Sequence, residues 1–211
     1  MKTQLKLIKA LLLIVLLTYI TSCTPAVEGN GNKKTKNFDL ASFKNISIKG
    51  KFSTAIKQGR KQQITLTTDE NLFDHINVEV SGETLVIEAK ERLKPKSKNF
   101  IQITTPSIEN LDLSGSVELS SKSLIKSNEL SINGSGAVDI DLILKVDKLN
   151  IDISGASEID LKGNATLLNV DISGAGELSA YELMTDEASL NISGAGSAQV
   201  NVESALEIDI T

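Results

Sequence analysis

A short turn of Ser or Asn followed by Gly recurs five times in the second half of the chain, each time directly after a hydrophobic segment. The first residues of successive turns lie 19, 21, 19 and 20 residues apart. A fixed period of about 20 residues is typical of solenoids, in which each repeat forms one coil. We expect each turn glycine to adopt a positive φ, which a residue without a Cβ tolerates. These glycines are Gly115, Gly134, Gly155, Gly174 and Gly194.

Apolar residues recur at fixed distances from these turns. In a strand, residues two apart share a face, so stacked coils would bring such residues into one interior. We therefore predict an all-β fold, a parallel β-helix-like solenoid with coils of about 20 residues. A barrel built from hairpins is the alternative, and we consider it weaker because aromatic residues, which pair across barrel strands, make up only 3% of the chain. The apolar residues directly before the turns are Leu113, Ile132, Ile153, Ile172 and Ile192.

The segment before the repeats alternates apolar and polar residues as well. Residues 77–80 and 84–89 predict two strands of a hairpin around Gly82. Residues 69–73 predict a short helical turn with Asp69 as its N-cap, and the basic residues 90–99 predict a loop. We therefore expect a β-rich N-terminal part containing a hairpin, and one solenoid domain over residues 38–211.

The first 22 residues have the organisation of a lipoprotein signal peptide. Three lysines precede an unbroken apolar run over residues 11–17. The sequence Ile20-Thr21-Ser22-Cys23 is similar to a lipobox, the bacterial signal that ends in a cysteine to be lipidated. We predict lipidation of Cys23, with an ordinary cleaved signal peptide as the alternative. We therefore expect the protein to be anchored in the cell envelope, at the outer membrane, on either its periplasmic or its external face.

Residues 23–37 are polar and contain two glycines and three lysines. Such a composition cannot bury a core, so we predict a flexible tether between the lipid and the folded domain.

The two halves of the chain carry opposite charge. Residues 101–211 contain 5 Lys and Arg against 18 Asp and Glu, which argues against nucleic acid as a partner because phosphate binding requires cations. We interpret the outward acidic column as a solvated face, with calcium bridging as the less favoured alternative, and predict no metal or cofactor. The column lies two residues before the turns and contains Asp112, Asp152, Asp171 and Asp209.

Several segments together carry a family resemblance. They are residues 43–50, 82–87 and 103–111, followed by the Ser-Gly-Ser and Ser-Gly-Ala-Gly turns. In this order they resemble the family called putative auto-transporter adhesin, head GIN domain, which is common among lipoproteins of Bacteroidetes. The resemblance covers about residues 38–211 and implies a β-helical fold and an adhesive role. It supplies no catalytic residues.

The last repeat ends at its turn, since residues 206–211 align with residues 149–154. We expect either that the sequence is a fragment lacking its final coils, or that the open C-terminal edge pairs with a partner or a second copy, because solenoids generally cover their ends.

Three functions fit these features. The first is a lipid-anchored binding module, adhesin-like, for a glycan or protein ligand. The second is an assembly protein that stacks through open β-edges as a homo-oligomer. The third, a polysaccharide-cleaving enzyme using Glu158 and Asp160, is the least favoured. Two acidic residues separated by one are common on the exposed face of a strand, and the basic residues that a lyase site also needs are scarce in the repeats. We therefore predict that the chain is not an enzyme.

Overall fold

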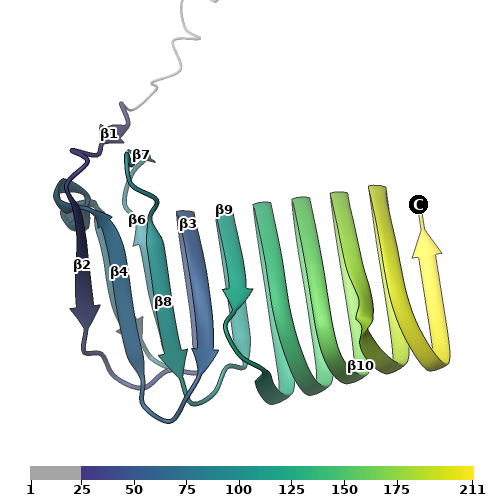
Figure 1. Ribbon diagram of the computed structural model, residues 1–211. Helices are drawn as coiled ribbons and strands as arrows, with labels where there is room; N and C mark the ends of the chain where they lie inside the picture. The colour runs from purple at the N-terminus through teal and green to yellow at the C-terminus, as the bar shows by residue number, and fades with distance from the viewer. Residues whose placement is uncertain (1–24) are drawn as a thin grey trace, which may run out of the picture.

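The computed structural model describes residues 25–211, and these residues form an all-β fold with mixed parallel and antiparallel pairing (Figure 1). One sheet has the strand order β10-β9-β3-β8-β4-β2, with β6 also pairing β3 and β5 pairing β6, while β1 and β7 form a separate pair. The elements are β1 (Val27–Glu28), β2 (Lys33–Phe38), β3 (Asn45–Gln58), β4 (Gln63–Asp69), the 3-10 helix η1 (Glu70–His75), β5 (Ile76–Ser81), β6 (Thr84–Ala89), β7 (Leu93–Lys94), β8 (Phe100–Thr105), β9 (Asn110–Ser121) and β10 (Ile125–Ile210).

The repeats lie side by side in parallel register. Strand β9 pairs with β3 on one side and with the first part of β10 on the other, so that Gly115 lies opposite both Gly50 and Gly136. The long ribbon β10 then turns back alongside itself at every repeat (Figure 1). Parallel pairing of consecutive segments therefore continues the pattern that β3 begins.

One column of glycines sets this register. Each member has a positive φ, and a Cβ at Gly115 would lie 2.6 Å from the carbonyl oxygen of Gly50. At every later member, a Cβ would approach the carbonyl oxygen of the preceding glycine even more closely. Only glycine fits where both the backbone angle and the neighbouring repeat exclude a side chain. The column contains Gly50, Gly115, Gly136, Gly155, Gly174 and Gly194.

The prediction that Gly134 is a turn glycine is wrong, since Gly136 takes that place opposite Gly115. Gly134 occupies an inward position instead, where a Cβ would lie 2.5 Å from Cδ1 of Ile153. Shifting a strand by two residues keeps every side chain on the same face, so apolar alternation could not distinguish the two registers. The backbone contact between Gly115 and Gly136 distinguishes them.

The interior is a continuous aliphatic core that runs from the N-terminal part through the repeats as far as Leu190. It is built almost entirely of Ile, Leu and Val, and most members expose 2% of their surface or less. Among the inward residues predicted before the turns, Leu113, Ile132, Ile153, Ile172 and Ile192 are all buried.

The N-terminal part contains the predicted hairpin, in which β5 and β6 pair antiparallel around Gly82. The predicted helical turn is present as η1, preceded by Asp69. The side chain of Asp69 does not cap this turn. It is fully buried and accepts hydrogen bonds from the backbone N–H groups of Lys96 (2.7 Å) and Ser97 (3.2 Å), so it fixes the loop before β8.

The flexible tether predicted over residues 23–37 is corrected where the structure describes it. Strand β2 pairs antiparallel with β4 from Lys33 onward. The preceding residues are tied to η1, because the N–H of Asn30 donates to Oδ1 of Asn71 at 2.8 Å and Nδ2 of Asn71 donates to the carbonyl oxygen of Glu28 at 2.8 Å. A polar segment can be ordered without a core of its own when a neighbouring sheet edge and side-chain amides satisfy its backbone.

Candidate functional site: a polar face on the repeats

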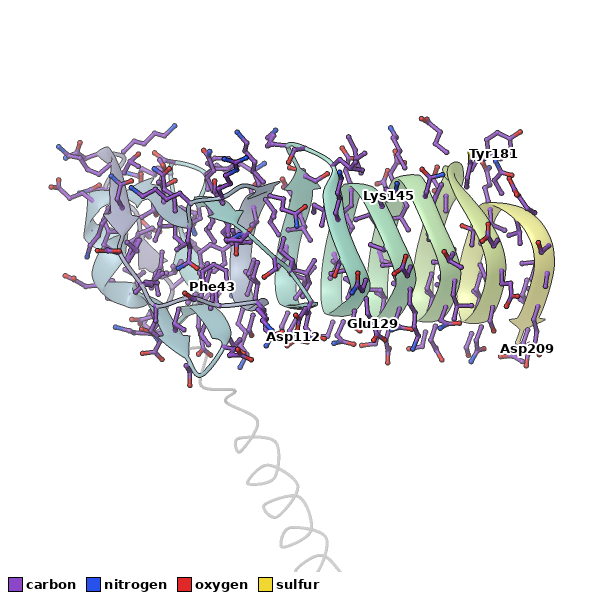
Figure 2. The ribbon with its side chains drawn as sticks, turned by 90° about the horizontal axis from the view of Figure 1, so that it is seen from below. Phe43, Asp112, Glu129, Lys145, Tyr181 and Asp209 are labelled. Carbon is purple, nitrogen blue, oxygen red and sulfur yellow. The ribbon has the colours of Figure 1, made fainter. Side chains whose placement is uncertain are left out.

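The outward side of the repeats carries a regular polar surface, which we call the Asx face. It consists of two neighbouring columns of short polar residues. The first column lies three residues before the stacked glycines, and all its members are exposed. Figure 2 shows Asp112 and Asp209 at the two ends of one side of the repeats. This aspartate column contains Asp112, Asn133, Asp152, Asp171, Asn191 and Asp209, and the asparagine column beside it contains Asn45, Asn110, Ser131, Asn150 and Asn169.

Asparagines separate most of the aspartates. Nδ2 of Asn133 donates to Oδ1 of Asp112 at 2.9 Å, and Nδ2 of Asn191 donates to Oδ2 of Asp171 at 3.1 Å. Strands in a sheet lie about 4.8 Å apart, so an unbroken row of carboxylates would repel itself. The interposed amides donate hydrogen bonds to the carboxylates and remove part of that repulsion.

The asparagine column forms a ladder of side-chain hydrogen bonds. Nδ2 of Asn110 donates to Oδ1 of Asn45 at 2.7 Å, and Nδ2 of Asn169 donates to Oδ1 of Asn150 at 2.9 Å. Nδ2 of Asn150 also donates to Glu129 at 3.0 Å. A hydrogen bond from Lys148, followed by that from Asn150, lowers the pKa of Glu129. These contacts fix the amide orientations across several repeats.

Two shallow hollows lie on the Asx face. One of about 270 Å³ is lined by Asp112, Asn133 and Asp152 together with serines, and the other, of about 460 Å³, is lined by Asn110, Ser131 and their neighbours. Both offer closely spaced hydrogen-bond donors and acceptors. Tyr181, the exposed aromatic residue of the last repeats, lies on the opposite side of the molecule (Figure 2). The face is therefore suited to hydrogen bonding and offers no ring for stacking.

A separate acidic column follows the stacked glycines. Glu118 and Asp139 lie opposite each other on β9 and β10, and Glu158 and Glu177 occupy the equivalent position of the next repeats. Lys98 donates to Glu118 at 2.5 Å, and this hydrogen bond is the main cause that lowers the pKa of Glu118. Among residues 25–211, no group of three or more His, Cys, Asp or Glu side chains has a geometry that could hold a metal ion.

The structure places the other candidate residues as follows. Asp112, Asp152, Asp171 and Asp209 all lie on the Asx face, and four of the five predicted turn glycines lie in the glycine column. Glu158 and Asp160 lie on one strand with a single residue between them, and Asp160 contacts Lys162 at 3.6 Å. Cys23 lies outside the described residues.

The sequence analysis named the aspartates of the Asx face but did not predict Asn133 among them or the asparagine ladder beside them. A turn opening at residue 133 would place Ser131 level with the aspartates, whereas the observed register places Asn133 opposite Asp112. Asparagines recurring at 150 and 169, spaced like the turns, were the signal that could have revealed the ladder.

Comparison with known proteins agrees with this architecture. The model of the family "Putative auto-transporter adhesin, head GIN domain" matches residues 42–211. The chain belongs to this family. Its sequence matches no curated protein. Within the described residues, no helix has the length and apolar character needed to cross a membrane.

Several solved structures share the fold of this head GIN domain protein. A putative adhesin from Bacteroides fragilis has a TM-score of 0.74 at 17% identity, over 88% of this chain and 98% of that one. A putative adhesin from Parabacteroides distasonis has a TM-score of 0.67 at 17% identity, over 88% and 100% of the two chains. A putative lipid binding protein from the same organism has a TM-score of 0.60 at 21% identity, over 88% and 98%. At these identities the likeness shows the fold alone.

Proposed function

We propose that this protein is a lipid-anchored, adhesin-like binding module of the cell envelope, whose repeats form a β-helical solenoid that displays the Asx face to a ligand. Membership in the head GIN domain family supports the adhesin-like role. The single observation that carries the binding role is the Asx face itself, a hydrogen-bonded array that extends over consecutive repeats.

The solenoid assignment is supported by the glycine column. Glycines at residues 115, 136, 155, 174 and 194 each approach the carbonyl oxygen of the preceding member, at spacings of 19 to 21 residues. A chain that returns to the same place at each repeat can present identical side chains in a straight row, which suits a ligand that is itself repetitive.

The ligand proposed for the Asx face is a polymer rich in hydroxyl and amide groups, either a glycan or an extended protein segment. Carboxylates accept hydrogen bonds from hydroxyl groups, and side-chain amides both donate and accept them. Recognition by hydrogen bonds in place of ring stacking agrees with the scarcity of aromatic residues on this face.

Binding to an array of envelope polymers, host glycans and matrix proteins tests this proposal. We expect a saturable signal that falls at least tenfold in the double variant Asp152→Ala, Asp171→Ala. The matched control is Glu158→Ala, Glu177→Ala, which removes two carboxylates that are also exposed, from the other column, and should leave binding unchanged. Equal losses in both double variants would contradict a role for the Asx face.

The lipid anchor is proposed from the leader and Cys23. Cys23→Ala should move the protein from the membrane fraction to the soluble fraction of cells, because acyl chains contribute roughly 0.8 kcal/mol for each buried methylene group. Retention of that variant in the membrane would reject lipidation at this residue.

A second candidate function is assembly through the last strand. The residues Leu206, Ile208 and Ile210 are 49%, 51% and 66% exposed, whereas Leu190 and Ile192, which precede them in the stack, are 2% exposed. An exposed apolar strand edge favours pairing with another chain. Sedimentation of the purified protein over a hundredfold concentration range should show oligomers if this role holds, and a monomer at every concentration would exclude it.

A further inference from the structure

The chain enters the folded domain beside a short basic segment. The N–H of Val27 donates to the carbonyl oxygen of Arg92 at 2.9 Å, and the N–H of Gly29 donates to that of Lys94 at 2.9 Å. Strand β1 thereby pairs with β7, at one end of the sheet strands (Figure 1). Cys23 precedes Val27 by four residues, which span at most about 14 Å when fully extended. An acyl chain on Cys23 would therefore hold the membrane close to β7.

Cations alternate along this segment. Every second residue from 90 to 98 is Lys or Arg and is exposed. Of the residues between them, Leu93, Pro95 and Ser97 are half-buried, and the exposed Glu91 is paired with His75. We call the exposed residues the cationic strip. Only Leu93–Lys94 of this segment is a strand, with bends on either side, so what the members share is their exposure to solvent around β7. Its members are Lys90, Arg92, Lys94, Lys96 and Lys98.

The strip is held in place through its backbone. The buried carboxylate of Asp69 accepts hydrogen bonds from the backbone N–H groups of Lys96 and Ser97. The loop is therefore held by the backbone of Lys96, and its side-chain ammonium group takes no part in these contacts. Lys94 lies 3.8 Å from Glu28 and Lys98 lies 2.5 Å from Glu118, both in exposed pairs, whereas Arg92 and Lys96 form no salt bridge within residues 25–211. The strip therefore keeps a net positive charge on a fixed frame.

A hollow of about 710 Å³ adjoins the strip. Four cations line it, Arg92, Lys94 and Lys98 from the strip and Lys51 from β3, against two carboxylates, Glu91 and Glu118. A hollow of this size can admit a phosphate-bearing headgroup between several cations.

We propose that the cationic strip is the face that the domain turns toward its own membrane, where it contacts anionic lipid headgroups. This inference rests on the proposed lipid anchor and adds a defined orientation to it. A single hydrophobic anchor combined with a basic patch is a recurrent means of fixing a protein at an anionic surface. The acidic repeats, with 18 Asp and Glu against 5 Lys and Arg over residues 101–211, would be repelled by the same surface. Attraction of the cationic strip to the membrane and repulsion of the acidic repeats from it would together keep the Asx face away from the membrane and accessible to a ligand.

The test uses the lipid-modified protein purified from membranes and reconstituted into vesicles, either zwitterionic or containing about one third anionic lipid. Because Cys23 is the only cysteine in the sequence and its sulfur would carry lipid, an engineered cysteine can be labelled alone. A fluorophore at Lys90→Cys reports on the strip, and one at Gln199→Cys reports on the last repeat. A quencher attached to the headgroups then measures how close each label lies to the membrane surface.

We expect the label at residue 90 to be quenched several times more strongly than that at residue 199 in anionic vesicles, and the difference to shrink in zwitterionic vesicles or at 1 M salt. The triple variant Arg92→Gln, Lys94→Gln, Lys96→Gln should abolish the difference. The matched control, Lys57→Gln, Arg60→Gln, Lys61→Gln, removes three cations near the loop between β3 and β4, at the other end of the strands (Figure 1), and should preserve it.

Flotation of the vesicles separates the two proposals. Protein that fails to float overturns the lipid anchor, and the orientation with it. Protein that floats with equal quenching of both labels, or with quenching that the triple variant does not change, overturns the orientation alone. Equal quenching combined with salt-sensitive retention on an immobilised anionic polysaccharide would assign the strip to a polymer and likewise overturn a membrane contact.

Discussion

The repeats and the N-terminal part of this domain are stabilised in different ways. In the repeats, each segment of about 20 residues places similar aliphatic side chains inside and one glycine against the preceding repeat. In the N-terminal part, buried polar groups connect segments that are distant in sequence. Thr68 contacts Asn99 at 2.6 Å through their side chains, and Nδ2 of Asn99 donates to the carbonyl oxygen of Lys51 at 3.2 Å. Repetition thus specifies one region, and individual polar contacts specify the other.

The strongest test of this contrast is the glycine column. Gly136→Ala should lower the free energy of unfolding by about 2–6 kcal/mol, because the new Cβ would be strained at positive φ and would meet backbone that cannot move aside. Gly134→Ala, two residues away and without a positive φ, should cost about 1 kcal/mol, since the end of the Ile153 side chain can shift. Urea unfolding followed by circular dichroism compares the two. A larger loss for Gly134→Ala would restore the register in which Gly134 is the turn glycine.

The next test compares equivalent inward positions along the repeats. Ile172 is fully buried and Ile210, in the last strand, is 66% exposed. Ile172→Ala should cost about 2–5 kcal/mol, the usual range for a buried isoleucine, and Ile210→Ala well under 1 kcal/mol. Thermal unfolding at low protein concentration measures both. A large loss for Ile210→Ala would indicate that another chain covers the last strand in solution.

In the N-terminal part the decisive residue is Asp69. Asp69→Asn replaces an acceptor of two backbone N–H groups by an amide, and leaving a buried donor unsatisfied should cost about 1–3 kcal/mol. The exposed Asp39→Asn serves as a control and should have no measurable effect. If both variants unfold like the parent protein, the buried carboxylate does not hold the loop that carries the cationic strip.

Asp69 also predicts a dependence on pH. Burial alone would raise its pKa, but hydrogen bonds from Ser97 and Lys96 outweigh burial and lower the pKa below the ordinary value of 3.8. The unfolded chain therefore binds this proton more tightly, so the stabilisation is present above about pH 3.8 and is lost as the pH falls through the lower pKa of the folded state. Stability measured between pH 5 and pH 2 should fall less steeply in Asp69→Asn than in the parent. Parallel curves would contradict this assignment.

The smallest effect is expected where the two regions meet. Lys98 of the N-terminal part and Glu118 of β9 form an exposed pair, with side chains 63% and 54% exposed. Lys98→Ala should lower the free energy of unfolding by roughly 0.2–1 kcal/mol, because water and salt screen such pairs. It should also raise the pKa of Glu118 toward its usual value, which a carboxyl titration by NMR would detect. An unchanged Glu118 pKa would show that the contact is not formed in solution.

Sequence patterns recovered the hairpin of β5 and β6, the inward aliphatic residues and most of the glycine column, because each depends on local spacing. They failed at Gly134 because a shift of two residues preserves the apolar alternation. They also failed over residues 27–37, where β2 is ordered by pairing with β4 and by the amide of Asn71. Partners that lie 26 to 43 residues away leave no trace in local composition.

By itself, then, the sequence determined the all-β class, the 20-residue period and the identity of the residues that point inward or outward, since these follow from alternation and from what glycine alone permits. The tertiary structure decided which glycine contacts which, how asparagines are interposed between aspartates on the Asx face, and that the entry of the chain lies beside the cationic strip. Those features depend on contacts between separate segments, and such contacts exist only after the chain has folded.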